Sequence, residues 1–148
     1  MTRVLVLEGP NLNLLGSREP AMYGRQTLDE IHAGIAARAA DLDLVVGFCQ
    51  SNHEGILIDR LHQRDFDVAI VNAGGLTHTS VSLRDALLAV ERPFIEVHLS
   101  DPATREPFRR VNFLTDIALE SIVGRGAQGY ALALESIARR VAAGELVR

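Results

Sequence analysis

The sequence has one cysteine, no tryptophan and few aromatic side chains, which make up 5% of its 148 residues. The lone thiol, Cys49, can form neither an intrachain disulfide nor a zinc cluster, so we interpret it as a small hydrophobic side chain within a strand. No apolar run approaches the roughly 18 residues of a membrane-spanning helix. A formal net charge of −4 without a basic tract argues weakly against nucleic-acid or membrane-surface partners.

The rest of the composition is that of an ordinary soluble protein, with 47% hydrophobic and 23% charged residues. A chain of this length is expected to form a single domain, residues 1–148, with a core of useful size. It begins almost directly with a predicted strand and lacks the apolar region of a signal peptide. We therefore expect a cytoplasmic protein.

Strand and helix patterns alternate from one end of the chain to the other. Short apolar runs predict strands at residues 3–8, 44–50, 67–72, 94–99 and 119–123. Apolar residues at helical spacing predict helices at residues 27–42, 54–64, 80–90 and 128–143, the first with Thr27 as N-cap and Glu30 three residues later. The strand patterns are continuously apolar, which indicates a parallel sheet covered on both faces. We expect an α/β fold, a flavodoxin-like three-layer sandwich with a five-stranded parallel sheet.

The most informative segment is a long loop from Gly9 to Gly24, between the first predicted strand and the first predicted helix. Such connections usually have only a few residues. In open α/β folds, ligands bind beyond the carboxyl ends of the strands, which is where this loop begins. Gly16 and Gly24 lie on either side of Arg18, and glycines in these positions suit a lid that opens and closes.

Polar residues follow the other strands too, and a parallel sheet would gather them at one edge. They are Asn11, Arg18 and Tyr23 after the first strand, Ser51, Asn52, His53 and Glu54 after the second, Asn72, Thr77, His78, Thr79 and Ser80 after the third, and His98, Ser100, Asp101, Arg105, Arg109 and Arg110 at and after the end of the fourth. Amides, imidazoles and guanidiniums together suit a small, oxygen-rich, anionic ligand.

Each of these residues also has a structural interpretation. Asn11 can form a turn, and the ring of Tyr23 can pack within its loop. His78 can cap the following helix, and His98 can be a hydrogen-bonded histidine at a strand end. His53, His78 and His98 match no compact zinc-binding spacing, so we predict no metal site. The functional interpretation depends on the convergence of these residues and not on any one of them.

Residues 124–129 match the pattern G-x-G-x-x-G after a predicted strand. A dinucleotide site would need a second strand and an acidic residue about 20 positions further on, and only one alanine-rich helix follows. We interpret these glycines as allowing a tight turn and close packing of the last helix.

Three segments resemble the signature motifs of one family. They are residues 9–24 (GPNLNLLGSREPAMYG), 72–80 (NAGGLTHTS) and 96–100 (EVHLS). On these motifs, and across essentially its whole length, the chain resembles the type II 3-dehydroquinate dehydratases. The resemblance implies trans elimination of water from 3-dehydroquinate through an enolate, giving 3-dehydroshikimate in the third step of the shikimate pathway. It also implies no metal and no organic cofactor.

The resemblance assigns five catalytic roles. Tyr23 resembles the general base that removes a proton beside the ketone, and Arg18 resembles the residue that favours its tyrosinate form. His98 resembles the general acid that protonates the departing hydroxyl, and Glu96 the partner that orients it. Asn11 resembles the residue that holds a water molecule or the enolate oxygen.

The remaining matched positions resemble substrate-binding residues, which are Asn72, His78, Leu99, Ser100 and Arg109. Asp85 resembles a residue that reaches the site of a neighbouring subunit in a trimer, and the family implies a homododecamer of four trimers. Two departures from the family pattern are small. Asp101 stands where asparagine is usual, so its charge weakens carboxylate binding unless it points away, and Leu99 replaces an isoleucine.

Three alternatives to a lyase are open to test. A flavin-binding module needs hydroxyl residues after the first strand, and residues 10–16 contain none. A receiver-type signalling domain needs an aspartate at the end of the third strand, where this chain has Asn72. The third is a family member that binds ligand without turning it over. The presence of Tyr23, Arg18 and His98 argues against it.

Overall fold

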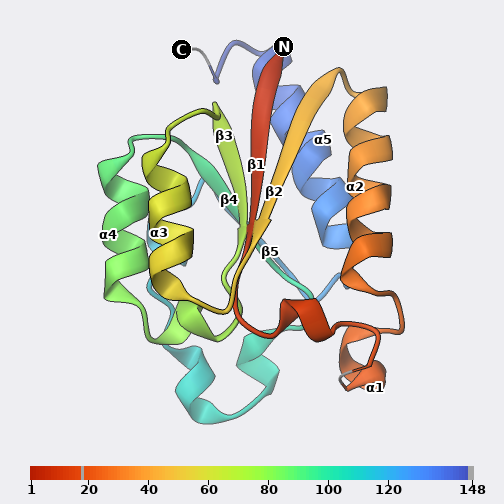
Figure 1. The fold of residues 1–148 in the computed structure, drawn as a ribbon, viewed down its shortest axis with the longest axis vertical. Coiled ribbons are helices and arrows are strands. Elements are labelled where there is room, and N and C mark those ends of the chain that lie inside the picture. The colour runs from red at the N-terminus through yellow and green to blue at the C-terminus, as the bar shows by residue number, and fades with distance from the viewer. Residues whose placement is uncertain (18, 147–148) are drawn as a thin grey trace.

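Five parallel strands form one sheet in the order β2-β1-β3-β4-β5 (Figure 1). The computed structural model describes residues 1–17 and 19–146, apart from the side chains of Met22 and Tyr23. The strands are β1 (Thr2–Glu8), β2 (Leu44–Gln50), β3 (Val68–Asn72), β4 (Phe94–His98) and β5 (Glu120–Val123). The predicted parallel α/β sheet is therefore confirmed.

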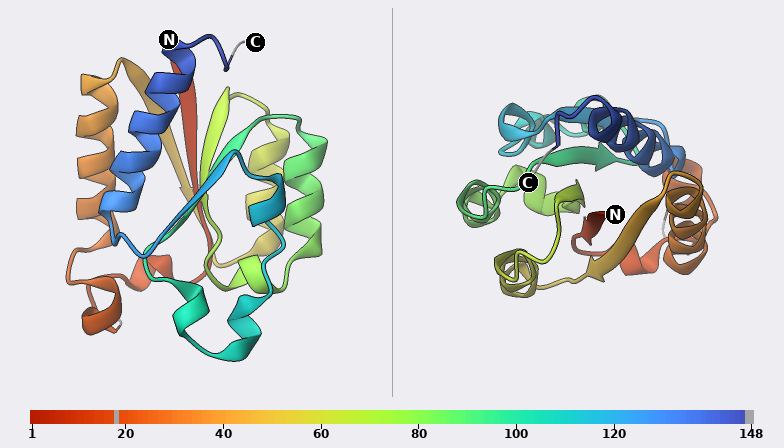
Figure 2. Two further views of the ribbon diagram at one scale, coloured as in Figure 1. Left: turned by 180° about the vertical axis from the view of Figure 1, so that it is seen from behind. Right: turned by 90° about the horizontal axis from the view of Figure 1, so that it is seen from above.

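Helices cover both faces of this sheet and complete the three predicted layers (Figure 2). On one face, α2 (Leu28–Asp41) and α5 (Gln128–Ala142) pack against inward-facing residues such as Val6, Ile70 and Val97. On the other face, α3 (Glu54–His62) and α4 (Val81–Ala89) pack against residues such as Leu7 and Val71. Among the residues described, no helix is both long and apolar enough to cross a membrane.

The first long helix shows how the local sequence produces this arrangement. Thr27 is its N-cap, and the Thr27 hydroxyl accepts a hydrogen bond from the backbone N–H of Glu30 at 3.2 Å, as predicted. The periodic apolar residues are all buried, and they are Leu28, Ile31, Ile35 and Ala39. The cap satisfies an otherwise free backbone donor, while the apolar face holds α2 against the sheet.

The edge strands depart from the prediction of continuously apolar, fully covered strands. In β5 and in the first five residues of β2, buried or half-buried residues alternate with exposed ones, and the last three residues of β2 are half-buried. Ser121 of β5 is exposed, and it pairs in register with Glu96 of β4. An edge strand has a neighbour on only one side, which leaves part of its surface in contact with water.

Short helices that the periodicity did not predict occupy the connections after the strands. They are α1 (Pro20–Tyr23) and the 3₁₀ turns Leu12–Leu14, Gly74–His78, Pro102–Thr104, Pro107–Arg110 and Thr115–Ile117. The glycines of the G-x-G-x-x-G segment have the predicted structural use. Gly124 and Gly126 adopt positive φ in the turn, and a Cβ on Gly129 would lie 3.2 Å from Val97 Cγ1, where α5 meets the sheet.

The loops after β1 and β3 approach each other backbone to backbone. The N–H of Gly9 donates to the carbonyl oxygen of Asn72 at 2.8 Å. A Cβ on Gly9 would lie 2.1 Å from the backbone oxygen of Ala73, which cannot move independently of its strand. Glycine at this position therefore permits the contact that brings the two loops together at the carboxyl end of the sheet.

We expect Gly9→Ala to lower the free energy of unfolding by about 1–3 kcal/mol, the usual cost of forcing an extra group into a close-packed position. Gly34→Ala is the matched control, because Gly34 is exposed within α2 and a Cβ there would meet nothing within 4 Å. That control should gain about 0.5–1 kcal/mol through lower backbone entropy of the unfolded chain. Urea unfolding of both variants checks the contrast, and equal effects would contradict it.

Candidate active site

A cavity of about 170 Å³ opens at the carboxyl ends of β1, β3 and β4. The loops that follow these three strands supply its walls. The lining residues are Pro10, Asn11, Leu12, Asn72, Gly74, Gly75, His78, His98, Leu99, Ser100, Pro102, Arg105 and Arg109. The cavity is thus at the edge of the sheet where the sequence predicted a ligand site.

Most of the predicted site residues meet in this cavity. Asn11, Asn72, His78, His98, Leu99, Ser100 and Arg109 all line it. Asp85 does not, because it lies on the exposed side of α4. Arg18 lies outside the described residues, and Tyr23 ends helix α1 without a described side chain.

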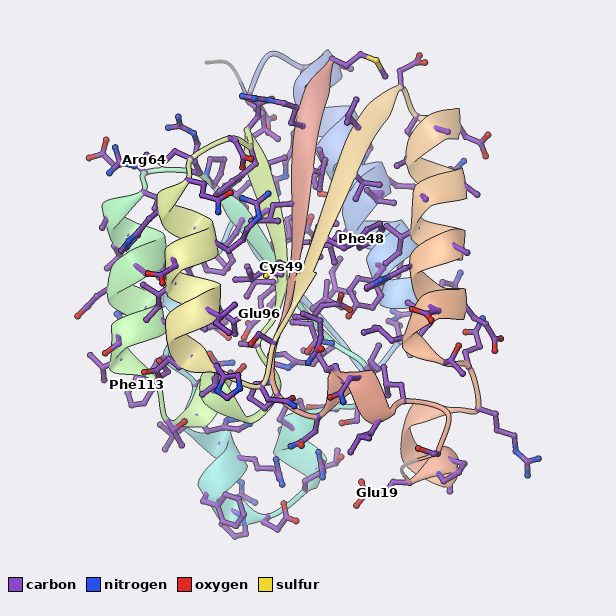
Figure 3. All side chains as sticks on the ribbon, viewed as in Figure 1. Glu19, Phe48, Cys49, Arg64, Glu96 and Phe113 are labelled. Atoms are coloured by element: carbon purple, nitrogen blue, oxygen red, sulfur yellow. The ribbon has the colours of Figure 1, made fainter. Side chains whose placement is uncertain are left out.

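Glu96, which is labelled in Figure 3, is completely buried and contacts His98. Its Oε2 accepts hydrogen bonds from His98 Nε2 and from Asn112 Nδ2, each at 2.8 Å. Its Oε1 accepts from the hydroxyls of Thr115 and Ser121, each at 2.6 Å. Since a carboxylate only accepts, His98 Nε2 carries a proton, and Nδ1 is left for chemistry in the cavity.

Two opposing effects set the pKa of Glu96. Burial raises it, but the hydrogen bonds from His98, Ser121 and Thr115 outweigh burial and lower the pKa to about 2. The carboxylate is therefore ionised throughout the neutral range. This fixed carboxylate holds the His98 imidazole in one orientation through the hydrogen bond at Nε2.

Because the folded state lowers the pKa of Glu96 from 4.5 to about 2, this group stabilises the fold above its unfolded pKa. The contribution, about 3 kcal/mol, is lost as the pH falls from 4.5 through 2. We expect the free energy of unfolding of the wild type to decline more steeply over that range than that of Glu96→Gln. Urea unfolding at a series of pH values checks this, and parallel curves would contradict it.

The donors that surround Glu96 were not predicted as site residues. Asn112 and Thr115 belong to the irregular segment between β4 and β5, where no periodic pattern places a side chain. Asn112 also accepts from the backbone N–H groups of Leu114 and Thr115, so its amide is held on both sides. Of these donors, only Ser121 could have been found from the sequence. It lies in a predicted strand, and pairing of that strand with its parallel neighbour places Ser121 opposite Glu96.

The backbone of Asn11 and the imidazole of His78, on the other walls, are also held in place. Asn11 adopts a left-handed backbone (φ 71°), and its N–H donates to Asn52 Oδ1 at 2.9 Å. His78 Nδ1 donates to the carbonyl oxygen of Val111 at 2.6 Å, which leaves its Nε2 free of that contact. His78 does not cap helix α4, because Ser80 does so through its hydroxyl.

Guanidinium groups provide positive charge at the outer wall of the cavity. Arg109 hydrogen-bonds Glu106 and lies with its Cζ 5.3 Å from the centre of the Phe108 ring. The Arg109 hydrogen bond lowers the pKa of Glu106, so this pair is ionised. Arg105 approaches Glu19 at 3.9 Å, which links this wall to the long loop after β1; Glu19 is labelled in Figure 3.

Asp101, the charged departure from the family pattern, points away from the cavity. Its Oδ1 accepts from the backbone N–H of Ala103 at 3.0 Å, and it caps the 3₁₀ turn that begins at Pro102. Its carboxylate is therefore engaged by the backbone and does not line the cavity.

This arrangement combines a proton donor with groups that bind an anion. An imidazole backed by a buried carboxylate opens onto a cavity lined by amides and two arginines. Within residues 1–17 and 19–146, no three histidine, cysteine, aspartate or glutamate side chains are grouped to hold a metal ion. The side chains present suit acid–base chemistry on a small, oxygen-rich anion.

The chain is similar to known proteins over nearly its whole length. The family model described as Dehydroquinase class II matches residues 2–138. A 3-dehydroquinate dehydratase from Methylococcus capsulatus is 55% identical over 139 residues, covering 92% of this chain and 94% of that protein. A catabolic 3-dehydroquinase from Pyricularia oryzae is 48% identical over 144 residues, covering 95% and 92%. The crystal structure of a type II dehydroquinase from Propionibacterium acnes matches with a TM-score of 0.90 at 35% identity, over 94% of this chain and 97% of that chain.

Proposed function

The chain belongs to the class II dehydroquinase family, and on that premise we propose that it dehydrates 3-dehydroquinate to 3-dehydroshikimate. This is the third step of the shikimate pathway. The observation that carries the proposal is the pair formed by His98 and buried Glu96, which opens onto an anion-binding cavity in a chain about half identical to enzymes of that name.

In the proposed mechanism, Tyr23 as tyrosinate removes a proton from the carbon beside the ketone. The electron pair of the broken C–H bond forms an enolate. A tyrosine has an ordinary pKa of about 10, so it needs a nearby positive charge to act as a base at neutral pH. Arg18, five residues earlier on the same loop, supplies that charge and stabilises the transition state.

The second step expels the hydroxyl group. The enolate electrons form the new carbon–carbon double bond as the C–O bond breaks, and His98 gives its proton to the departing oxygen, so that water leaves. Glu96 keeps the imidazolium stable until that transfer. Asn11 holds a water molecule or the enolate oxygen while negative charge is present.

The other cavity residues bind the substrate in this proposal. Asn72 and His78 bind its oxygens, Leu99 and Ser100 present backbone groups and a hydroxyl, and Arg109 attracts its carboxylate. That carboxylate competes with Glu106 for the Arg109 guanidinium. Asp85, exposed on α4, reaches the site of a neighbouring subunit in a trimer, and four trimers form a cytoplasmic homododecamer. The reaction uses neither a metal nor an organic cofactor.

The test is to mix the purified protein with 3-dehydroquinate and follow the ultraviolet absorbance of the conjugated enone product. We expect absorbance to rise at the same rate with and without a chelator. A folded sample that binds 3-dehydroquinate without any rise would instead support the ligand-binding alternative. A rise abolished by chelator and restored by a divalent cation would contradict the metal-free mechanism.

A further inference from the structure

A second carboxylate, Glu8, is completely buried at the end of β1, and the proposed chemistry does not use it. It lies on the face of the sheet covered by α2 and α5, whereas Glu96 points toward the opposite face. His32 Nε2 contacts its Oε1 at 2.5 Å, and the hydroxyl of Tyr130 contacts its Oε2 at 2.8 Å. A buried charge with this many dedicated partners calls for an explanation.

The contacts continue from Tyr130 into the candidate active site. Tyr130 is fully buried on α5, and Asn72 Nδ2 lies 3.0 Å from its hydroxyl oxygen. Asn72 in turn lines the cavity. Hydrogen bonds therefore link His32 on α2, through Glu8 and Tyr130, to a wall of the cavity.

The direction of each hydrogen bond follows from the chemistry of the groups. An amide nitrogen donates and does not accept, so Tyr130 must accept from Asn72. The single hydroxyl proton of Tyr130 is then left for Glu8, which accepts it as a carboxylate. Burial, together with the charge of Glu8, raises the pKa of Tyr130 well above its ordinary value, so the hydroxyl keeps this proton.

The orientation of the Asn72 carboxamide follows from that direction. Its nitrogen faces Tyr130, and its oxygen accepts from the backbone N–H of Gly74 at 3.4 Å. Among the described residues, no acceptor meets the second hydrogen of Asn72 Nδ2. Without an acceptor at Tyr130, only the long contact from Gly74 is left to distinguish the nitrogen of the amide from its oxygen.

We propose that Tyr130 and Glu8 are positioning residues for the active site: they hold the Asn72 carboxamide so that its second N–H donates to an oxygen of the substrate. The ligand in question is the one assigned above, so its identity rests on the proposed function. His32 holds the other oxygen of Glu8, because its Nε2 donates to Glu8 Oε1. The His32 ring is itself fixed by stacking on Phe48, with ring centroids 4.1 Å apart.

A double-mutant cycle tests whether Tyr130 acts through Asn72. We expect Tyr130→Phe to lower kcat/KM about tenfold, the effect of one misplaced hydrogen bond to a substrate. In an Asn72→Ala background, the same change should have almost no effect, because no amide is left to orient. Equal factors in the two backgrounds, or an unchanged kcat/KM in the single variant, would overturn the proposal.

Two further comparisons separate positioning from loss of stability. Ser136→Ala is the matched control, because Ser136 is a buried hydroxyl on the same helix whose hydrogen bond goes to Glu120. This variant should have a lower free energy of unfolding and an unchanged kcat/KM.

The second comparison uses two variants of Glu8. Glu8→Gln keeps an oxygen that can accept from Tyr130, so its kcat/KM should stay within about threefold of the wild-type value. Glu8→Met has a similar shape without that oxygen, so its kcat/KM should match that of Tyr130→Phe. Equal activity in the two Glu8 variants would contradict the proposal.

A crystal structure of the Tyr130→Phe variant gives a result that does not depend on turnover. We expect the Asn72 side chain to leave its wild-type orientation or to occupy two. A single unchanged orientation would overturn the positioning role even if kcat/KM falls. If the wild type does not turn over 3-dehydroquinate, the proposed function fails, while the crystal structure still decides how Asn72 is held.

Discussion

Replacing Tyr23 with phenylalanine should lower kcat by a factor of about 10²–10⁴, the range that a positioned general base contributes. The change removes only the phenolic oxygen, so the enzyme loses its proton acceptor and keeps the ring. Because the loss affects a chemical step and not substrate binding, KM should change little. The absorbance assay of the enone product measures both constants.

The surroundings of Tyr23 make this variant easy to interpret. The residue ends the short helix Pro20–Tyr23, which forms after the left-handed residue Glu19 and stops at Gly24 with a φ of 82°. This helix lies in the long loop after β1, at the lower edge of the molecule in Figure 1, and its residues Pro20 and Ala21 are exposed. We expect the free energy of unfolding of Tyr23→Phe to equal that of the wild type. Turnover at the wild-type rate would remove Tyr23 from the mechanism.

Most of the fold could be predicted from the sequence. The expected ends of the five strands and four long helices agree with the observed ends to within two residues. Buried parallel strands need apolar side chains on both faces, and that requirement leaves a strong pattern. The edge strands β2 and β5 were predicted less well, since their partial exposure depends on the strand order, which the local pattern does not contain.

The candidate site was predictable to the extent that the topology determines it. Parallel strands end at one edge, so polar residues at or after the ends of β1, β3 and β4 had to converge, and Asn11, His78 and His98 do line one cavity. Asn72 lies at the end of β3, where a receiver-type signalling domain needs an aspartate. Membership of the class II dehydroquinase family excludes both the receiver-type domain and the flavin-binding module.

The groups that hold these side chains could not be predicted from spacing. Glu8 and Tyr130 are 122 positions apart, and Asn112 reaches Glu96 from a segment without regular periodicity. A helix or a strand repeats its side-chain directions, so local spacing reveals one face of one element. Contacts between two elements depend on how the elements pack, and that information is spread over the whole core.

The two buried carboxylates now have parallel explanations. Glu96 orients an imidazole from one face of the sheet, and Glu8, through Tyr130, orients an amide from the other. Glu8 ends β1 and Glu96 lies in the middle of β4. Each carboxylate is surrounded by donors, so its burial is compensated. We infer that the site is held from both sides of the sheet.

The assignment of His98 as the acid leads to the second large effect. His98→Gln should lower the rate of dehydration by about 10²–10⁴, because the departing hydroxyl loses its proton donor. Glutamine can still donate a hydrogen bond to Glu96, so the buried network should remain satisfied and the fold intact. Dehydration and unfolding measurements on the same sample check both statements.

The same variant separates the two proposed steps. With His98 replaced, Tyr23 can still remove the proton beside the ketone, and the enolate can only take a proton back. In deuterated buffer, we therefore expect His98→Gln to return substrate that carries deuterium at that carbon, detectable by mass spectrometry, while little product forms. Tyr23→Phe serves as the control and should show neither exchange nor product. If His98→Gln gave no exchange above that control, proton removal would also require His98, and base and acid could not be assigned to two separate residues.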